Sequence, residues 1–306
     1  MKQDESIFKR GVNSFKKNGF KKTLYKIFKF IRGIGVLSFS SDIRALWFES
    51  KEISNFGDNL TPYLIEKLSG KKPYLVNRYC CKEYYLMAGS ILSEANKNSI
   101  IFGTGIMIEK EKFKKPKKVL AVRGPLTRKR LIELGYNCPD IYGDPALLLP
   151  LVYKPKVAKQ YQIGIIPHYV DYDRVKENLE EDNNFFIINI LDPIEKVIDD
   201  INKCEKTISS SLHGLIVSHA YGIPSLWVKF SDNLAGDDTK FYDYLCSVNI
   251  MSEGFLNLQN YKFSLETIKK EFMERREIAE VSRSIIQKLQ KNLLNLWPLP
   301  IYKRKN

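Results

Sequence analysis

Residues 207–214, Thr-Ile-Ser-Ser-Ser-Leu-His-Gly, place three serines and a histidine where an apolar run gives way to a helical pattern. Free backbone N–H groups and the helix dipole at such a point attract anions, and phosphate above all. The hydroxyls of Ser210 and Ser211 add hydrogen-bond donors, and His213 adds a group that titrates near neutral pH. We predict a phosphate-binding turn here, with a serine N-cap and a histidine that only packs as the alternative.

Charged side chains follow other apolar runs in the same way. Arg123 lies in a Val-Arg-Gly-Pro turn, where a guanidinium can bind phosphate or carboxylate through two parallel hydrogen bonds. It could equally be a surface or capping residue. Asp58 and Asp144 are candidate acids, bases or hydroxyl-binding groups, and they are equally candidate turn residues.

The other two histidines receive different predictions. His168 ends an apolar run and could face a ligand, whereas His219 lies six residues after His213, points away from it on a helix and is predicted to be structural. Residues 103–105, Gly-Thr-Gly, lack the third glycine of a dinucleotide-binding fingerprint. No carboxylate or histidine belongs to a recognisable metal-ligand set, so we expect neither a metal nor a cofactor.

Short apolar runs must position these residues. They begin near residue 45 and alternate with helical stretches, as is typical of parallel sheets in α/β domains. The predicted strands cover residues 45–48, 84–88, 99–102, 118–122, 162–166, 185–190, 206–209 and 225–228. Ligands bind such sheets at the carboxyl edge of the strands, which is where the polar residues fall. One long helix is predicted over residues 265–293.

These patterns predict an α/β protein with two Rossmann-like domains and a ligand cleft between them. A Lys-Pro-Lys linker at 154–156 separates them. We expect a basic N-terminal segment at 1–40, a first domain at 41–153, a second domain at 154–262, and a C-terminal helix and tail at 263–306.

Positive charge is concentrated near the N-terminus. The chain has a formal charge of +14, and its first 40 residues hold ten basic and two acidic side chains. Phe8, Val12 and Phe15, and then apolar residues after Gly19, follow helical spacing among lysines. Residues 1–36 therefore fit a helix on an anionic membrane surface or a helix packed on the protein. Nucleic acid is a weaker candidate because no recognised binding module is present.

Other features favour a cytoplasmic protein. No apolar run approaches the roughly 20 residues that span a bilayer, and no secretory signal pattern follows the basic start. The five cysteines form no C-x-x-C pair, so we expect reduced and mostly buried thiols.

Six segments occur in the order found in polysaccharide pyruvyl transferases, and the chain resembles that family over about residues 45–230. The segments are residues 55–60, 89–92, 102–105, 122–128, 143–146 and 211–214. The resemblance implies a glycosyltransferase-B-like pair of domains, with the donor bound in the second. It also implies transfer of a pyruvyl group from phosphoenolpyruvate to two hydroxyls of one sugar, in a surface polysaccharide or its lipid-linked precursor, forming a cyclic ketal.

The resemblance also assigns roles to residues. Arg123 and His213 would bind the donor, with Leu212 contributing its backbone. The other candidate binding residues are Ser210, Ser211, Gly214, Asn59, His168, Gly103 and Thr104, and the catalytic candidates are His213, Asp58 and Asp144. Ser211 departs from the arginine common at the first position of the family's Arg-Leu-His-Gly motif. We expect Arg128 or Lys229 to supply the missing cation.

Two alternatives stay open. A glycosyltransferase that uses a sugar nucleotide can have the same architecture, since fold alone does not fix the reaction. A non-catalytic protein could bind anionic membrane or nucleic acid through residues 1–36. For the pyruvyl transferase, a lipid-linked acceptor would place the enzyme at the inner face of the plasma membrane. Ala at His213 or Arg123 is then expected to lower turnover without unfolding the protein.

Overall fold

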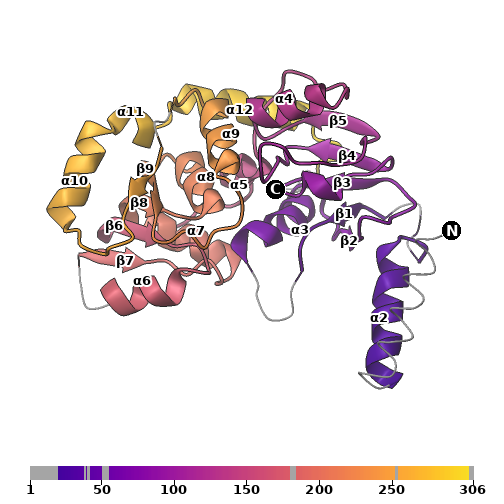
Figure 1. The fold of residues 1–306 in the computed structure, drawn as a ribbon, viewed down its shortest axis with the longest axis horizontal. Coiled ribbons are helices and arrows are strands. Elements are labelled where there is room, and N and C mark those ends of the chain that lie inside the picture. Colours follow the sequence, from indigo (N-terminus) through magenta and orange to yellow (C-terminus); the bar gives the residue numbers. More distant parts are fainter. Residues whose placement is uncertain are drawn as a thin grey trace.

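The computed structural model describes residues 20–37, 39, 42–49, 55–179, 184–251 and 254–302. Its strands form two sheets (Figure 1), and both are parallel, as the sequence predicts. Each sheet has five strands, one more than predicted. The first sheet contains β1 (Arg44–Leu46), β2 (Tyr74–Leu75), β3 (Tyr84–Leu86), β4 (Ser99–Phe102) and β5 (Lys118–Ala121). The second contains β6 (Tyr161–Ile166), β7 (Phe185–Ile187), β8 (Cys204–Ser209), β9 (Ser225–Lys229) and β10 (Leu256–Asn257). Strand β2 and strand β10 were not predicted.

The two sheets have the same strand order. The first runs β2-β1-β3-β4-β5, and the second, read from its other end, runs β7-β6-β8-β9-β10. In each sheet the chain starts at an inner strand, adds one neighbour on one side and then proceeds to the other side. The order therefore reverses between β1 and β3 and again between β6 and β8. Crevices at the carboxyl ends of such strand pairs are where open α/β sheets bind ligands.

Helices between the strands cover both sheets. Those of the first half are α3 (Phe56–Ser69), α4 (Pro125–Glu133) and α5 (Leu149–Val152), with the 3-10 helices η1 (Leu92–Glu94) and η2 (Pro145–Leu148). Those of the second half are α6 (Tyr172–Leu179), α7 (Ile194–Asn202), α8 (Leu212–Ala220) and α9 (Thr239–Ser247). All four residues of β4 are buried, which is the consequence of covering a parallel sheet on both faces.

A continuous apolar core joins the two halves. Phe56 of α3 and Leu148 of η2 belong to the same buried cluster as Leu212 of α8 and Ile190 after β7. The backbone N–H of Phe56 also donates to the carbonyl of Ile190 at 2.9 Å. The start of α3 is thereby attached to the second sheet. The predicted domain boundaries stay predictions, although residues 154–160 between the halves form no helix or strand.

The single helix predicted over residues 265–293 is wrong. The segment forms three helices, α10 (Leu265–Glu274), α11 (Arg276–Ala279) and α12 (Arg283–Asn295). Phe272 of α10 packs in the core of the second sheet, whereas Gln290 of α12 donates to the carbonyl of Leu147 in the first half at 2.8 Å. The segment contacts both halves, as predicted, and it changes direction because its two apolar faces pack on different parts of the molecule (Figure 1).

Helix α2 (Phe20–Gly33) projects away from the first sheet in Figure 1. Its C-terminal end is attached, because the carbonyls of Gly33 and Ile34 accept from the backbone of Asn77 and Cys81 at 2.8 and 3.1 Å. Five apolar residues along the helix are exposed, namely Leu24, Tyr25, Ile27, Phe28 and Ile31. Phe30 is half-buried, and its ring lies 6.0 Å from that of Tyr79. In the described residues most of the apolar face is therefore not buried against the body. Phe8, Val12 and Phe15 lie outside the described residues.

The cysteines are all free, as predicted, but they are less buried than expected. Cys80 and Cys204 are buried, Cys138 and Cys246 are half-buried, and Cys81 is exposed. Within the described ranges, no helix combines the length and apolar character that crossing a membrane requires.

Candidate functional site

The starts of α3 and α8 meet between the two sheets. A Cβ atom placed on Gly57 would lie 2.1 Å from Nδ1 of His213, so only glycine admits the imidazole at this position. Gly57 follows β1, and His213 follows β8. Strands β1 and β8 each belong to the pair at which the strand order of their sheet reverses. This contact therefore brings the predicted ligand-binding edges of both sheets together, and it gives a steric reason for the glycine in residues 55–60.

His213 faces Asp144 across this meeting point. Its Nε2 atom lies 3.8 Å from Oδ2 of Asp144, and the two side chains are 12% and 0% exposed. Asp144 is the N-cap of η2, where its Oδ1 accepts from the N–H of Ala146 at 2.9 Å. The facing atoms, Nε2 of His213 and Oδ2 of Asp144, have no hydrogen-bond partner in the described part of the chain. Buried polar atoms are seldom left unpaired, so we take this pair as the centre of the candidate site.

Burial shifts the pKa values of Asp144 and His213 in opposite directions. It raises the pKa of Asp144 to about 6, because burial penalises the charged carboxylate. Burial, followed by the charges of Arg123 and Lys240, lowers the pKa of His213 to about 3. At pH 7 the histidine is therefore neutral. These shifts favour a neutral His213 beside a carboxyl group that binds a proton more readily than an exposed one.

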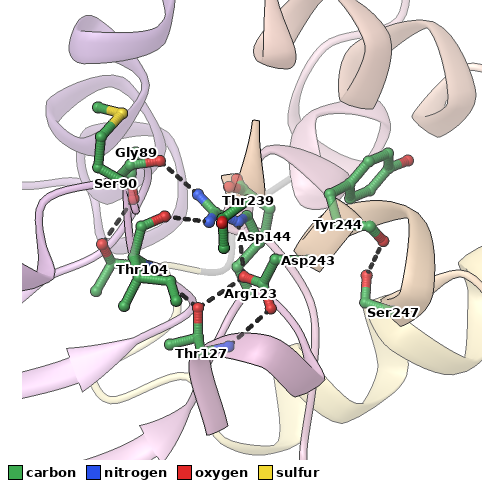
Figure 2. A network of polar contacts seen from close by, with 12 residues as sticks. Gly89, Ser90, Thr104, Arg123, Thr127, Asp144, Thr239, Asp243, Tyr244 and Ser247 are labelled. Carbon is green, nitrogen blue, oxygen red and sulfur yellow. Dashed lines mark hydrogen bonds and ion pairs between the residues drawn. The ribbon is translucent and has the colours of Figure 1, made fainter. Parts of the chain in front are cut away.

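Arg123 is fully buried in a polar network beside this pair (Figure 2). Its guanidinium donates to Oδ2 of Asp243 at 3.0 Å, to the hydroxyl of Ser90 at 2.6 Å and to the carbonyl of Ile106 at 2.6 Å. The interpretation of Arg123 as a surface or capping residue is therefore wrong. A Cβ on Gly105 would lie 2.4 Å from the guanidinium carbon, which explains the second glycine of residues 103–105.

Asp243 connects α9 to the end of β5. Besides Arg123, its carboxylate accepts from the backbone N–H of Thr127 at 2.9 Å and from the hydroxyl of Thr127 at 2.7 Å. Sequence reasoning missed Asp243, because a lone aspartate within a helix resembles a solvent-facing residue. Its position opposite Arg123 depends on how α9 packs on α4, which no local pattern reveals.

Lys240, one turn before Asp243 on α9, was also missed. Its side chain is 8% exposed, and its charge contributes to lowering the pKa of both His168 and His213. The two cations expected from the sequence each have an acidic neighbour, and their role toward a donor stays a prediction. Arg128 has its Nε 4.0 Å from Asp140, and Lys229 pairs with Asp238 at 2.6 Å.

The serines at the start of α8 have local partners. The hydroxyl of Ser211 caps the helix by accepting from the N–H of Gly214 at 3.4 Å, so the predicted N-cap is present. The hydroxyl of Ser210 accepts from the N–H of His168 at 2.9 Å. This bond joins the ends of β6 and β8, and both Ser210 and Leu212 are buried.

The other two histidines differ as the sequence suggests. His168 is half-buried, and burial together with the charge of Lys240 lowers its pKa to about 4. His219 is buried, with Nδ1 3.0 Å from the hydroxyl of Tyr244 and Nε2 3.3 Å from the carbonyl of Ser225. These contacts fit the structural role predicted for His219.

The remaining candidates are Asp58, Asn59, Gly103 and Thr104. Asp58 lies in the first turn of α3, beside the half-buried Asn59; its Oδ2 accepts from Asn55 at 3.2 Å, and burial raises its pKa. The hydroxyl of buried Thr104 donates to the carbonyl of Gly89 at 2.6 Å, and Gly103 follows β4. Their substrate roles stay predictions. Among the described residues, no three His, Cys, Asp or Glu side chains gather into a group that could hold a metal ion.

A family model for polysaccharide pyruvyl transferase matches residues 23–232. The chain belongs to this family. The match covers β1 to β9 and most of the candidate site, including Gly57, Arg123, Asp144 and His213. Lys240 and Asp243 lie beyond the matched residues.

Two further comparisons report similar proteins. An uncharacterized protein of Acanthamoeba polyphaga mimivirus is 37% identical over 206 residues, which cover 62% of this chain and 70% of the viral one. A solved structure from E. coli, the RcsC C-terminus containing a linker region and a phosphoreceiver domain, is 13% identical with a TM-score of 0.24, covering 78% of this chain and 94% of that one.

Proposed function

We propose that the protein transfers the pyruvyl group of phosphoenolpyruvate to two hydroxyls of one sugar, forming a pyruvate ketal on a polysaccharide or its precursor. The observation that carries the proposal is the His213–Asp144 pair. Its facing atoms are buried, lie 3.8 Å apart and lack partners in the described residues. Family membership supports the reaction class, and the arrangement of charges around the pair supports the donor.

The donor carries a phosphate and a carboxylate, so it needs positive charge and hydrogen-bond donors. Lys240 supplies buried positive charge that acts on His213, whereas the charge of Arg123 is compensated by Asp243. The start of α8 supplies backbone N–H groups and the positive end of a helix dipole, which suit an oxyanion. Burial strengthens each of these interactions, because little water competes with the ligand.

The reaction requires one proton at carbon and two new carbon–oxygen bonds. A proton added to the methylene carbon of phosphoenolpyruvate makes it a methyl group and leaves positive charge at C2. One sugar hydroxyl bonds to C2 and loses its proton, and the bond from C2 to the phosphate oxygen breaks. The second hydroxyl then bonds to C2, and its proton leaves with the inorganic phosphate.

Asp144 is the proton source that fits this scheme best. In the free protein its pKa is raised to about 6 by burial, and the negative charge of a bound donor raises the pKa of a nearby acid further. A general acid works best when its pKa lies near the working pH. Neutral His213 then donates a hydrogen bond to the ligand and orients it, instead of acting as the acid that the sequence suggested.

The acceptor in this proposal is lipid-linked, and α2 holds the enzyme at the membrane that carries it. The exposed residues Leu24, Ile27, Phe28 and Ile31 recur at the spacing of one helix face. The same helix contains five basic residues and no acidic one. An exposed apolar face with basic flanks is the composition of a helix that lies on an anionic membrane surface.

Donor choice tests the proposed reaction. The protein is incubated with an acceptor glycan panel and either phosphoenolpyruvate or UDP-sugars, and the release of inorganic phosphate and UDP is measured. Acceptor-dependent phosphate release from phosphoenolpyruvate supports the proposal. Release of UDP with transfer of a sugar would show the alternative glycosyltransferase instead.

A further inference from the structure

Lys240 is a buried cation without a close counter-ion in the described part of the chain. Its side chain is 8% exposed, and its ammonium group donates to the carbonyl of Ala235 at 3.2 Å. Among the described residues, no carboxylate oxygen lies within 4.0 Å of Nζ. The three carboxylates within three residues of Lys240 are engaged elsewhere. Asp237 accepts from the backbone N–H groups of Glu109 and Thr239, Asp238 pairs with Lys229 and Asp243 pairs with Arg123.

Such an arrangement is unfavourable unless something compensates it. Removing an ammonium from water costs free energy, and buried charges in proteins are ordinarily paired. Each ammonium carries three N–H donors, of which the structure gives Lys240 one protein acceptor among the described residues. The face of the Phe241 ring, 5.6 Å from Nζ, provides a weak attraction that does not replace an anion.

The charge of Lys240 acts on the candidate site. It lowers the pKa of His168, which follows β6, and of His213, at the start of α8. The charge of Arg123, at the end of β5, in turn lowers the pKa of Lys240. Helix α9, which carries Lys240, contacts α8, which carries His213, and the carboxylate of Asp243 is already used by the ion pair with Arg123.

We propose that Lys240 binds the phosphate group of the donor in the site formed by His213 and Asp144. A phosphate dianion supplies the counter-charge that Lys240 lacks and accepts the remaining N–H donors. An ammonium suits this role because it acts as a compact point charge toward phosphate. This assignment rests on the proposed function for the identity of the donor, but the anion site itself does not depend on the reaction.

The protonation of Lys240 predicts how phosphate binding depends on pH. Burial, followed by the charges of Arg123 and Lys229, lowers the pKa of Lys240 to about 8, while Asp238 opposes the shift. The ammonium is charged below that pH and neutral above it. Phosphate affinity in the wild-type protein therefore falls as the pH rises through about 8. The charged and titratable groups around Lys240 are Arg123, His168, His213, Lys229, Asp238 and Asp243.

Calorimetric titration with inorganic phosphate tests the assignment directly. Lys240→Met keeps the length of the side chain and removes its charge, and we expect phosphate to bind it about ten- to a hundredfold more weakly. Lys240→Arg keeps the charge at high pH and should retain binding above pH 8. Lys203→Met is the matched control. Lys203 lies just before the start of β8, whereas Ser210 follows the end of that strand, and Lys203 pairs with Asp200 at 2.7 Å. Its affinity should equal that of the wild type.

A second titration uses pyruvate, which has the carboxylate of the donor without the phosphate. Pyruvate binding should change little in Lys240→Met; a loss for pyruvate with none for phosphate would overturn the assignment. Unchanged phosphate affinity in Lys240→Met also overturns it. If Lys240→Met does not fold, the wild-type protein decides, since a phosphate affinity that stays constant between pH 7 and pH 9 contradicts the proposal.

The two proposals can fail separately. Lys240-dependent phosphate binding without any consumption of phosphoenolpyruvate would retain the anion site and reject the pyruvyl transfer reaction. Consumption of phosphoenolpyruvate by Lys240→Met with an unchanged KM for that donor would retain the reaction and reject the role of Lys240.

Discussion

Arg123 and Asp243, 120 residues apart in the chain, form a fully buried ion pair with an Nε–Oδ2 distance of 3.0 Å. The pair joins the end of a strand in the first half to a helix of the second. Ser90, Ile106 and Thr127 complete the network around it (Figure 2). The pair therefore fixes the two halves at the candidate site.

Asp243→Asn is expected to destabilise the protein by about 3–5 kcal/mol, because it leaves the buried guanidinium of Arg123 uncompensated. Urea denaturation measures the change. Glu271→Gln is the control, since Glu271 pairs with Arg275 at a more exposed position and should matter little. Equal stabilities of the two variants would contradict the structural role of the pair.

The same burial revises what Arg123→Ala should do. The sequence suggested lower turnover with an intact fold, but the structure shows that this change would leave Asp243 buried without its cation. We now expect loss of stability together with loss of activity, which the same denaturation experiment detects. A fully stable Arg123→Ala protein would restore the simpler view of a ligand-binding arginine.

His213→Asn should lower kcat strongly while the folded protein remains stable. His213 makes no hydrogen bond through Nε2 in the described residues, so its replacement breaks no bond of that atom. Loss of one positioned group of this kind typically costs about 10²–10⁴-fold in rate. Thermal melting monitors the fold, and His219→Asn provides the contrast, because His219 contacts Tyr244 and Ser225 and its loss should lower stability instead.

Gly57→Ala should displace the His213 ring and lower turnover, because the new Cβ would lie 2.1 Å from Nδ1. Gly135→Ala is the control. Gly135 has a positive φ of 77°, and a Cβ added there would meet nothing within 4 Å, so alanine costs about 1 kcal/mol of backbone strain without touching the site. Normal turnover in Gly57→Ala would contradict the close approach of α3 and α8.

Asp144→Asn should lower activity and, at high pH, raise the stability of the protein. The pKa of Asp144 is raised from 3.8 to about 6, so its contribution to stability is present below pH 3.8 and is lost as the pH rises through 6. Above that pH the ionised carboxylate costs about 3 kcal/mol. The variant should therefore exceed the wild type in stability by more at pH 8 than at pH 5. A stability difference that is the same at both pH values would contradict the burial of a charged carboxylate.

Phe28→Asp should weaken binding to vesicles of phosphatidylglycerol and phosphatidylcholine by about tenfold or more, because it removes a large apolar side chain from the membrane face. Met273→Asp changes a residue on α10 that is also apolar and is 70% exposed, and it should bind normally. Co-sedimentation at low and high salt measures both proteins. Equal vesicle binding by the two variants would contradict the membrane role proposed for α2.

Much of the fold could be predicted because its signals are local. Apolar runs such as residues 99–102 form strands, and the helix that begins after Ser211 has the expected cap. The break between α10 and α12 could not be predicted, because both helices keep a helical apolar period and only their separate packing surfaces require a turn.

The residues of the candidate site likewise include some that the sequence identified and some that it did not. His213, Asp144 and Gly57 follow strands in recognisable turns, so sequence reasoning identified the two titratable residues and the segment that contains the glycine. Asp243 and Lys240 lie within α9, where a charged residue predicts solvent exposure. Their burial results from the docking of α9 against α4 and the end of β5, which only the three-dimensional structure reveals.

The most direct test of the central claim follows the carbon atoms of the donor. Phosphoenolpyruvate labelled with ¹³C at C3 is incubated with the protein and an acceptor glycan, and the product is examined by NMR. We predict a labelled methyl signal on a quaternary ketal carbon attached to the sugar, formed by the wild type and nearly absent with His213→Asn. The account is contradicted if the wild type forms no such ketal with any acceptor while transferring sugar from a nucleotide donor, or if His213→Asn forms the ketal at the wild-type rate.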